Sequence, residues 1–394
     1  MSETYDAMVV GAGPAGSYLA YRLAKLGYKV LVFERRPKVG DAVCCTGIVG
    51  KECLDRFPIA NDTPAVQANS ATFYAPSGES LSLRKETAQA YVVDRAAFDN
   101  ALARRAQDEG AEYLMSARVN DLVLFDHRVR ADVELGGRTG NFEGKVAVIS
   151  TGFGASLPGK LGLGKISDFV LGAQAEVDIK GVDEVEIYMG QSIAPGFFAW
   201  LVPTTSGRGL AGLLTRRDPP SYLKNFLSKL HEQGKIASTD VECNYGGIPL
   251  RPLSRTYRDR VVVVGDAAGQ VKPTTGGGVY YGMLCADIAA DTIHEALCAD
   301  DFSAERLADY EQRWKRILAK EIQIGYLARR FYEKLSDSQI EHIFGIIQAD
   351  RIHEDLLRSP DFSFDWHGDA ILRVLGHRTM ARTIWRMAKS LLPL

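Results

Sequence analysis

Long apolar runs are missing from this chain of 394 residues, and so is an excess of charge of either sign. No stretch approaches the roughly 18 to 20 consecutive apolar residues that span a bilayer. Residues 1–13 contain acidic residues and a glycine turn where a secretory signal needs a basic start and an apolar run. The net charge of −2 gives no field that would recruit nucleic acid. We therefore expect a cytoplasmic protein with no nucleic-acid partner.

Cysteine and histidine are also scarce. The six cysteines include no C-x-x-C pair, and the seven histidines are scattered. This usage argues against a secreted disulfide scaffold and against a zinc site, so no metal is predicted. Cys44 and Cys45 are adjacent, which is a poor geometry for a mutual disulfide. A chain of this length exceeds one small core and predicts two or three domains, or one large interrupted domain.

A glycine-rich turn stands close to the start of the chain. An apolar strand at 6–10 leads into Gly11-x-Gly13-x-x-Gly16, and a helical stretch follows as far as Gly27. Gly11 permits the tight turn, Gly13 lets the backbone approach a pyrophosphate, and Gly16 lets the helix pack on the strand. The helix start, which includes the predicted contacts Pro14 and Ala15, presents free N–H groups and completes a predicted anion site for a dinucleotide.

An acidic residue ends the next apolar strand. Residues 29–33 form this strand, and Glu34 follows it, 18 positions past Gly16. A carboxylate there accepts both hydroxyls of a ribose and repels a 2′-phosphate. The ligand is therefore predicted to be FAD or NAD rather than NADP, with Arg35 beside Glu34 as a further contact.

A second motif distinguishes FAD from NAD. An apolar strand at 261–264 runs into Gly265-Asp266, and Pro273 and the run Gly276-Gly277-Gly278 follow. Asp266 at a helix entrance can bond the hydroxyls of a polyol, and the glycine run exposes N–H groups to the edge of a planar ring. FAD has a ribityl chain that needs such an acid, whereas NAD has none. FAD is the predicted cofactor, and a purely structural strand–turn–helix is the alternative.

The remaining pattern predicts an α/β (α+β overall) fold in which a Rossmann-like FAD-binding domain is interrupted by an antiparallel β-sheet substrate domain. Helical spacing at 94–109, with Asp94 as the N-cap, and a strand at 145–150 indicate the FAD-binding domain. Short apolar segments between about 165 and 250 indicate the antiparallel sheet. From about 303 the pattern is mainly helical. The predicted domains are 1–70 with 90–160 and 255–300, then 71–89 with 161–254, then a helical region at 301–394.

These motifs together resemble the geranylgeranyl reductase family, within the para-hydroxybenzoate-hydroxylase-like flavoproteins. The resemblance covers roughly residues 5–300 and includes G-A-G-P-A-G with Glu34, D-R-x-x-F-D at 94–99, and G-D-A-A-G with P-T-T-G-G-G at 265–278. Three further elements favour the reductases: Cys44-Cys45-Thr46-Gly47, the aromatic-x-Trp-x-x-Pro element at 198–203, and Gly-x-Ile-Pro at 246–249. Phe198 stands where the family often has Tyr.

The resemblance implies additional contacts and an activity. FAD contacts are implied for Cys45, Thr46, Ile48, Arg95, Val119, Gly152, Asp266, Gly278 and Val279. Cys45, Phe198 and Trp200 are implied to lie in the substrate cavity beside the flavin and to serve catalysis. The implied reaction is reduction of C=C double bonds of an isoprenoid chain on a prenyl lipid by hydride from reduced flavin. NAD(P)H or ferredoxin would be the electron donor.

Several alternatives stay open. An FAD monooxygenase or halogenase acting on an aromatic substrate shares the fold, although hydroxylases usually have Asp-Gly where this chain has Thr151-Gly152. An electron carrier to quinone and a flavin-binding protein without turnover are the other two. Phe198 and Trp200 could equally form ordinary sheet core, because residues two apart on a strand share a face, and Cys45 could simply pack against the flavin.

The last helix carries basic residues on one side. Arg373, Arg378, Arg382, Arg386 and Lys389 follow Asp369 with no further acid, and Met380, Ile384, Met387 and Leu391 recur at helical spacing. Such a helix could lie on an anionic membrane surface and collect lipid substrate. The alternative is a basic-faced helix that packs on its own protein.

Overall fold

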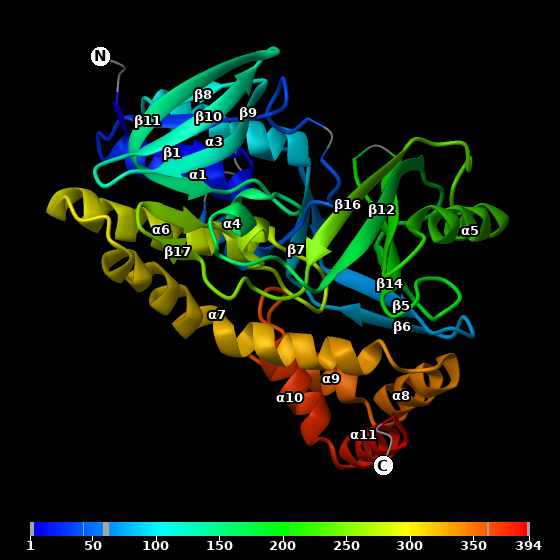
Figure 1. Ribbon diagram of the computed structural model, residues 1–394. Helices are drawn as coiled ribbons and strands as arrows, with labels where there is room; N and C mark the ends of the chain where they lie inside the picture. Colours follow the sequence, from blue (N-terminus) through cyan, green and yellow to red (C-terminus); the bar gives the residue numbers. More distant parts are fainter. Residues whose placement is uncertain (1–3, 42, 58–62, 206, 361, 392–394) are drawn as a thin grey trace.

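The computed structural model describes residues 4–41, 43–57, 63–205, 207–360 and 362–391, with side chains described as far as residue 387. Two sheet-containing lobes lie side by side, and helices of the C-terminal region pass beneath both (Figure 1). The strands of the described residues form three sheets. Their elements are given below with the residues that make them.

The first sheet is the Rossmann-like one. Its strand order is β17-β18-β11-β1-β2-β8, and β11, β1, β2, β8 and β18 pair in parallel. β9 and β10 form an antiparallel extension on β11. The strands are β1 Thr4–Val10, β2 Val30–Phe33, β8 Glu112–Leu114, β9 Ala117–Leu124, β10 Val129–Leu135, β11 Arg138–Ile149, β17 Tyr257–Arg258 and β18 Val261–Val263.

Helices cover one face of this sheet. They are α1 Pro14–Lys25, α3 Arg95–Asp108 and α6 Val279–Ala299, and their buried residues share one core with alternate residues of β1, β2 and β11. The Asp94 side chain accepts a hydrogen bond from the Ala97 N–H at the start of α3, as the sequence predicted. On the other face, β9, β10 and the short helix α4 Leu157–Lys160 enclose a second core.

The second sheet has the order β16-β12-β15-β14-β13-β5-β6. Its pairs are antiparallel except β13 with β5, which is parallel. The strands are β5 Ser70–Tyr74, β6 Ser80–Arg84, β12 Phe169–Asp178, β13 Val185–Met189, β14 Phe198–Pro203, β15 Arg208–Thr215 and β16 Cys243–Pro249. Helix α5 Pro219–Glu232 packs on its outer face, which leaves the inner face toward the rest of the protein.

A small third sheet connects the lobes. It has the order β3-β7-β4, with β3 Ile48–Gly50, β4 Ala65–Ala68 and β7 Ala90–Val93, and the helix α2 Lys51–Arg56 follows β3. The C-terminal region contains α7 Ala304–Tyr332, α8 Asp337–Ala349, α9 Ile352–Arg358, α10 Gly368–Gly376 and α11 Arg378–Leu391. The α/β fold with an interrupting sheet and a helical C-terminal region is confirmed; the exact domain boundaries stay a prediction.

Helix α7 braces the two lobes (Figure 1). In its first half the Trp314 indole donates to the Thr256 hydroxyl, 3.1 Å away, in the first lobe. At its end the Tyr332 hydroxyl donates to the Phe197 carbonyl, 3.1 Å away, in the second. Helix α7 therefore contacts both lobes and lines part of the space between them.

Candidate cofactor and substrate site

A cavity of about 970 Å³ lies where the two lobes and the C-terminal helices meet. One end is lined by the glycine turn after β1 and by the segments that follow β2, β11 and β18. The other end is lined by the inner face of the second sheet, by α7 and by residues 362–371. Ligands of open α/β sheets bind at the carboxyl ends of the strands, which is where the first end lies.

The glycine turn is held against the end of β11. A Cβ on Gly11, whose φ is +109°, would lie 2.5 Å from the Ser150 carbonyl oxygen. A Cβ on Gly16 would lie 2.1 Å from the Gly11 carbonyl oxygen. The Ser150 hydroxyl donates to the carbonyls of Val10, at 3.0 Å, and Gly11, at 2.8 Å. Only glycine fits these two positions, and Gly13 and the start of α1 are left facing the cavity.

Glu34 is fixed at the edge of the same cavity end. Its carboxylate accepts hydrogen bonds from the Ala12 N–H, at 3.0 Å, and the Arg36 N–H, at 2.9 Å. A carboxylate has about four lone-pair sites, so two bonds leave it able to accept from ribose hydroxyls. Arg35 lies beside it on the cavity wall.

Asp266 faces the cavity from the turn after β18, in a 3-10 helix at Gly265–Ala268. Burial raises the pKa of this carboxyl to about 6. Among the described residues, no donor bonds its side-chain oxygens, and a Cβ on Gly278 would lie 2.3 Å from Oδ1. A half-buried acid whose oxygens accept no hydrogen bond from the described residues, next to a glycine-lined loop, fits the ribityl chain and ring edge of a flavin.

The loop at 44–47 lies between the second sheet and the end of the cavity that the glycine turn lines, which we call the cofactor end. The Thr46 hydroxyl donates to the Gln174 side-chain oxygen, at 2.8 Å, on β12. Burial raises the pKa of the Cys44 thiol to about 11, so this thiol keeps its proton near neutral pH. Arg95 makes two hydrogen bonds to Asp99, both 3.1 Å, and lies beside Cys45. The loop is thus held from both lobes.

An apolar wall forms the other end of the cavity. The rings of Phe198 and Trp200 stand at an interplanar angle of 62° with centroids 6.1 Å apart, on the same face of β14 as predicted. The Trp200 ring covers Gly212, where a Cβ would lie 2.5 Å from its Cζ2 atom. Ile187 and Met189 of β13 continue the wall. Phe198 and Trp200 therefore line a cavity rather than only a sheet core.

The structure brings together most of the residues that the sequence predicted. The lining of this one cavity includes Gly11, Gly13, Pro14, Ala15, Glu34, Arg35, Cys45, Thr46, Ile48, Arg95, Gly152, Phe198, Trp200, Asp266, Gly276, Gly277, Gly278 and Val279. Three predicted contacts are not among the described lining residues. Gly16 lies behind the turn, Val119 packs in the core around β9, and Pro273 is buried beneath Gly325 of α7. Their role toward a cofactor stays a prediction.

Sequence reasoning missed the contribution of the C-terminal region. His367 lines the cavity, and its Nδ1 accepts a hydrogen bond from the Thr274 hydroxyl at 2.5 Å. Lys272 and Asp365 form a buried ion pair beside the glycine run. Arg329 of α7 also faces the cavity. Within the described part of the chain, groups of side chains that could hold a metal ion are absent, and so are helices long and apolar enough to cross a membrane.

Comparison with known proteins agrees with this architecture. The family model described as lycopene cyclase protein matches residues 6–346. The chain is 31% identical to a digeranylgeranylglycerophospholipid reductase of Methanocaldococcus jannaschii, over 86% of this chain and 90% of the relative. A protein with the same name from Methanosphaerula palustris is 32% identical, over 93% of this chain and 98% of the relative.

A solved structure shares the whole fold. It is a geranylgeranyl bacteriochlorophyll reductase-like protein of Thermoplasma acidophilum, with a TM-score of 0.84 and 24% identity, and the match covers 98% of this chain and 99% of that one. The sequence motifs, the fold and the extent of these matches agree. The chain belongs to the geranylgeranyl reductase family of flavoproteins.

Proposed function

We propose that this chain is an FAD-dependent reductase of the C=C double bonds in the isoprenoid chain of a prenyl lipid. One observation carries the proposal: the polar cradle for a dinucleotide and the apolar, aromatic wall line the same cavity. The relatives' name, digeranylgeranylglycerophospholipid reductase, indicates the same substrate class. A lipid chain needs a long apolar channel beside the redox group, and this cavity offers both.

The chain's own residues bind and orient the two ligands. Glu34 would accept the ribose hydroxyls of FAD, the turn at Gly13 would donate N–H groups to its pyrophosphate, and Asp266 would accept from its ribityl hydroxyls. FAD, once reduced, supplies the hydride that the reaction needs. Phe198 and Trp200 exclude water and hold the alkene in place, and their faces tolerate positive charge that develops on it.

The site leaves the electron donor to an external partner. NAD(P)H or ferredoxin would reduce the flavin, since the sequence offers no second glycine-rich turn after a strand. Anaerobic mixing of the oxidised protein with each donor in turn, followed by the flavin absorbance, distinguishes them. The donor that bleaches the flavin fastest at equal concentration is the physiological candidate.

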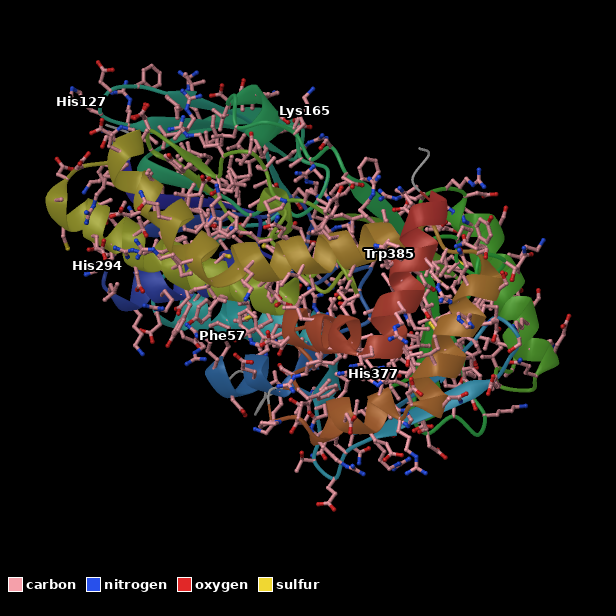
Figure 2. The ribbon with its side chains drawn as sticks, turned by 90° about the horizontal axis from the view of Figure 1, so that it is seen from below. Phe57, His127, Lys165, His294, His377 and Trp385 are labelled. Carbon is pink, nitrogen blue, oxygen red and sulfur yellow. The ribbon has the colours of Figure 1, made fainter. Side chains whose placement is uncertain are left out.

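Contact with a membrane would use the outer side of α10 and α11. Met380 is buried against α8, α9 and α10, and Met387 against α8 and the end of α7, so this part of the predicted apolar side packs on the protein. Trp385 on α11 (red in Figure 2) is 60% exposed, and Leu372 and Leu375 of α10 are exposed with it. Exposed arginines flank these three residues: Arg373, Arg378, Arg382 and Arg386. Lys389 and Leu391 lie outside the described side chains.

An aromatic residue among arginines suits the surface of an anionic bilayer. Co-sedimentation with vesicles of phosphatidylglycerol tests this contact. Trp385→Ser should reduce the bound fraction several-fold, and neutral phosphatidylcholine vesicles should bind less than the anionic ones. Equal binding of the variant and the parent protein would contradict the contact.

The reductase activity has a direct anaerobic test. The protein with FAD is reduced by dithionite, a geranylgeranyl lipid is added, and product mass and flavin absorbance are followed together. A gain of two hydrogens per turnover with reoxidation of the flavin is expected. An unchanged mass with the flavin still reduced would rule out this substrate class. Oxygen-dependent turnover of an aromatic acceptor would instead support a monooxygenase or halogenase.

A further inference from the structure

Arg329 occupies an unusual position on α7. The buried residues of this helix follow one another at steps of three or four, as the inner stripe of a packed helix does: Leu307, Tyr310, Trp314, Leu318, Ile322, Gly325 and Arg329. Arg329 continues this stripe with a charged group, and its side chain is 2% exposed. It lines the cavity at the end formed by the second sheet.

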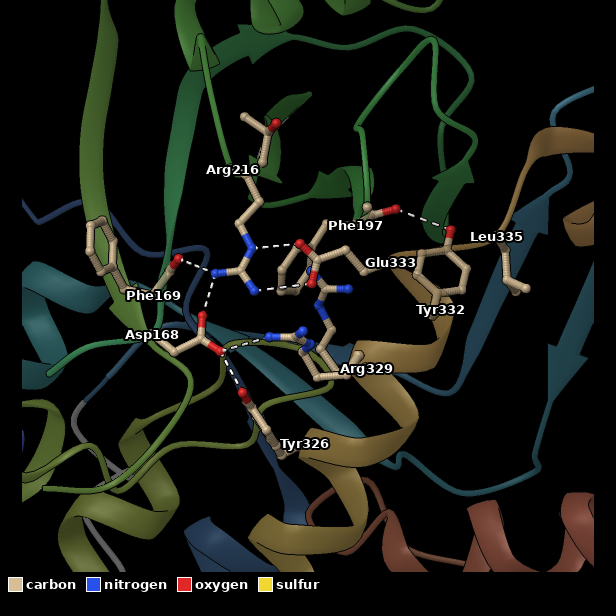
Figure 3. Close-up of polar contacts among 12 residues, drawn as sticks. Asp168, Phe169, Phe197, Arg216, Tyr326, Arg329, Tyr332, Glu333 and Leu335 are labelled. Atoms are coloured by element: carbon tan, nitrogen blue, oxygen red, sulfur yellow. Dashed lines mark hydrogen bonds and ion pairs between the residues drawn. The ribbon is translucent and has the colours of Figure 1, made fainter. Parts of the chain in front are cut away.

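The guanidinium of Arg329 lacks a hydrogen-bond acceptor. Among the described residues, none of its three nitrogens donates a hydrogen bond. Its Cζ lies 3.3 Å from the centroid of the Phe197 ring, and its nearest carboxylate oxygen, on Glu333, is 3.7 Å away (Figure 3). Buried polar groups are nearly always bonded, so an unbonded buried cation points to a missing partner.

The neighbouring carboxylates are engaged elsewhere. Arg216 donates to both oxygens of Glu333, at 2.7 and 3.0 Å, and also to Asp168 (Figure 3). The Tyr326 hydroxyl donates to the other oxygen of Asp168, at 2.7 Å. Both acids are therefore hydrogen-bonded to other groups, and Glu333 gives Arg329 an ion-pair contact without a hydrogen bond.

The charges of this group do not balance. Two acids, Asp168 and Glu333, stand against three cations, Arg216, Arg329 and Arg330, of which Arg330 lies 3.8 Å from Asp168 and is half exposed. One positive charge is in excess, on the cavity side. Desolvation lowers the pKa of Arg329 to about 10, against the opposing effect of Glu333, so the group is still charged near neutral pH.

We propose that Arg329 binds the phosphate of the prenyl lipid's polar head, so that the head is fixed at one end of the cavity and the isoprenoid chain runs along the aromatic wall toward the flavin. This inference rests on the proposed function and deepens it. A guanidinium presents a planar fork of N–H donors that matches a phosphate in two bonds. A fixed head would decide which double bonds reach the hydride.

The experiment measures binding, without turnover, by calorimetry on the oxidised holoenzyme. The probes are geranylgeranyl phosphate, geranylgeraniol and inorganic phosphate. The parent protein should bind geranylgeranyl phosphate on the order of 10- to 100-fold more tightly than geranylgeraniol, as expected for charge-assisted hydrogen bonds. Arg329→Gln should lose most of that preference and leave the affinity for geranylgeraniol within a few-fold.

Matched variants separate binding from folding. Arg330→Gln removes the neighbouring, half-exposed arginine and should keep the preference for the phosphate. Arg329→Lys keeps the charge but loses the planar fork of donors, so an intermediate preference for the phosphate is expected. If Arg329→Gln does not fold, the preference is measured on Arg329→Lys instead. Thermal melting and bound flavin are measured for each.

The outcomes are distinct. Equal loss of affinity for the phosphate and the alcohol in both Arg329 variants would assign the residue a structural role and overturn the inference. Inorganic phosphate that binds as tightly as geranylgeranyl phosphate would show a free-phosphate site rather than a lipid-head site. Reduction of geranylgeraniol without any preference for the phosphate would overturn this inference alone. Failure of both prenyl probes to bind and to be reduced would overturn the proposed function as well.

Discussion

The Lys272 ammonium lies 2.9 Å from the Asp365 carboxylate, and the two side chains are 6% and 1% exposed. Lys272 precedes the glycine run at 276–278, and its backbone N–H donates to the Gly277 carbonyl at 3.0 Å. Asp365 lies in the segment before α10. The pair therefore links the C-terminal helical region to the loop that is predicted to hold the flavin ring.

Removal of one member of this pair should destabilise the protein. Asp365→Asn leaves a buried ammonium without its counter-charge, and such a change typically costs about 3 to 5 kcal/mol of unfolding free energy. Urea denaturation of the parent and the variant measures the difference. Lys51→Gln breaks the exposed pair with Asp55 and should cost at most about 1 kcal/mol. An equally small effect of both changes would contradict the structural role of the buried pair.

Much of the fold was predictable because local signals and tertiary contacts agree. The strand before Gly11, the cap at Asp94 and the strand before Asp266 were expected close to where they are found. The strands between 165 and 250 were also expected, from short apolar segments. The parallel pairing of β13 with β5 was not, because those strands lie more than 100 residues apart and no local pattern encodes which of them meet.

Some residues of the candidate site were predictable from local sequence, and others were not. The glycine turn and Glu34 carry their signal in spacing, since backbone approach and strand ends demand particular residues at particular positions. Asp365 and His367 carry none, because only tertiary packing brings residues 362–371 to the cavity. Arg329 did leave a trace in the sequence: a charged residue that continues an apolar stripe at steps of three and four. The periodicity of the helix therefore predicts that Arg329 is buried, although it does not predict what Arg329 binds.

His367 should make stability depend on pH. Its Nε2 donates to the Phe364 carbonyl at 2.8 Å, which leaves Nδ1 to accept from the Thr274 hydroxyl, and this second bond requires the neutral ring. Desolvation and the nearby Lys272 lower its pKa from 6.5 to about 4. The folded state thus binds fewer protons than the unfolded state between these values. Stability present above pH 6.5 should fall as the pH drops toward 4, by at most about 3 kcal/mol.

Melting temperature as a function of pH measures this dependence. His367→Gln should flatten the curve between pH 6.5 and 4, because an amide takes up no proton in that range. His127→Gln, at the exposed edge of the molecule in Figure 2, should leave it unchanged. A curve that is the same for the parent protein and the His367 variant would contradict the assignment.

Glu34 should contribute to the retention of FAD. Its carboxylate already accepts two backbone N–H groups and has lone pairs left for the ribose hydroxyls. Glu34→Ala should weaken FAD binding on the order of 10- to 100-fold, the range for lost hydrogen bonds to a charged group. Fluorescence titration of the flavin-free protein with FAD gives the dissociation constant. Glu232→Ala, exposed at the end of α5, is the control and should not change it.

Gly212 should control the position of the Trp200 ring, and through it the access of substrate. A Cβ at this position would lie 2.5 Å from Cζ2 and 2.7 Å from Cε2 of the indole, and 2.9 Å from the Ala173 carbonyl oxygen. Gly212→Ala must therefore push the ring into the cavity, because the strand behind it cannot move as easily. The KM for a geranylgeranyl lipid should rise at least several-fold while FAD binding is retained, since the cofactor end is formed by other segments.

Gly345→Ala on α8 is the control: a Cβ there meets open space, so the substitution should change neither the KM nor FAD binding. Loss of FAD together with substrate affinity would show instead that the substitution disrupts the whole second sheet, and an unchanged KM would remove Trp200 from the substrate wall.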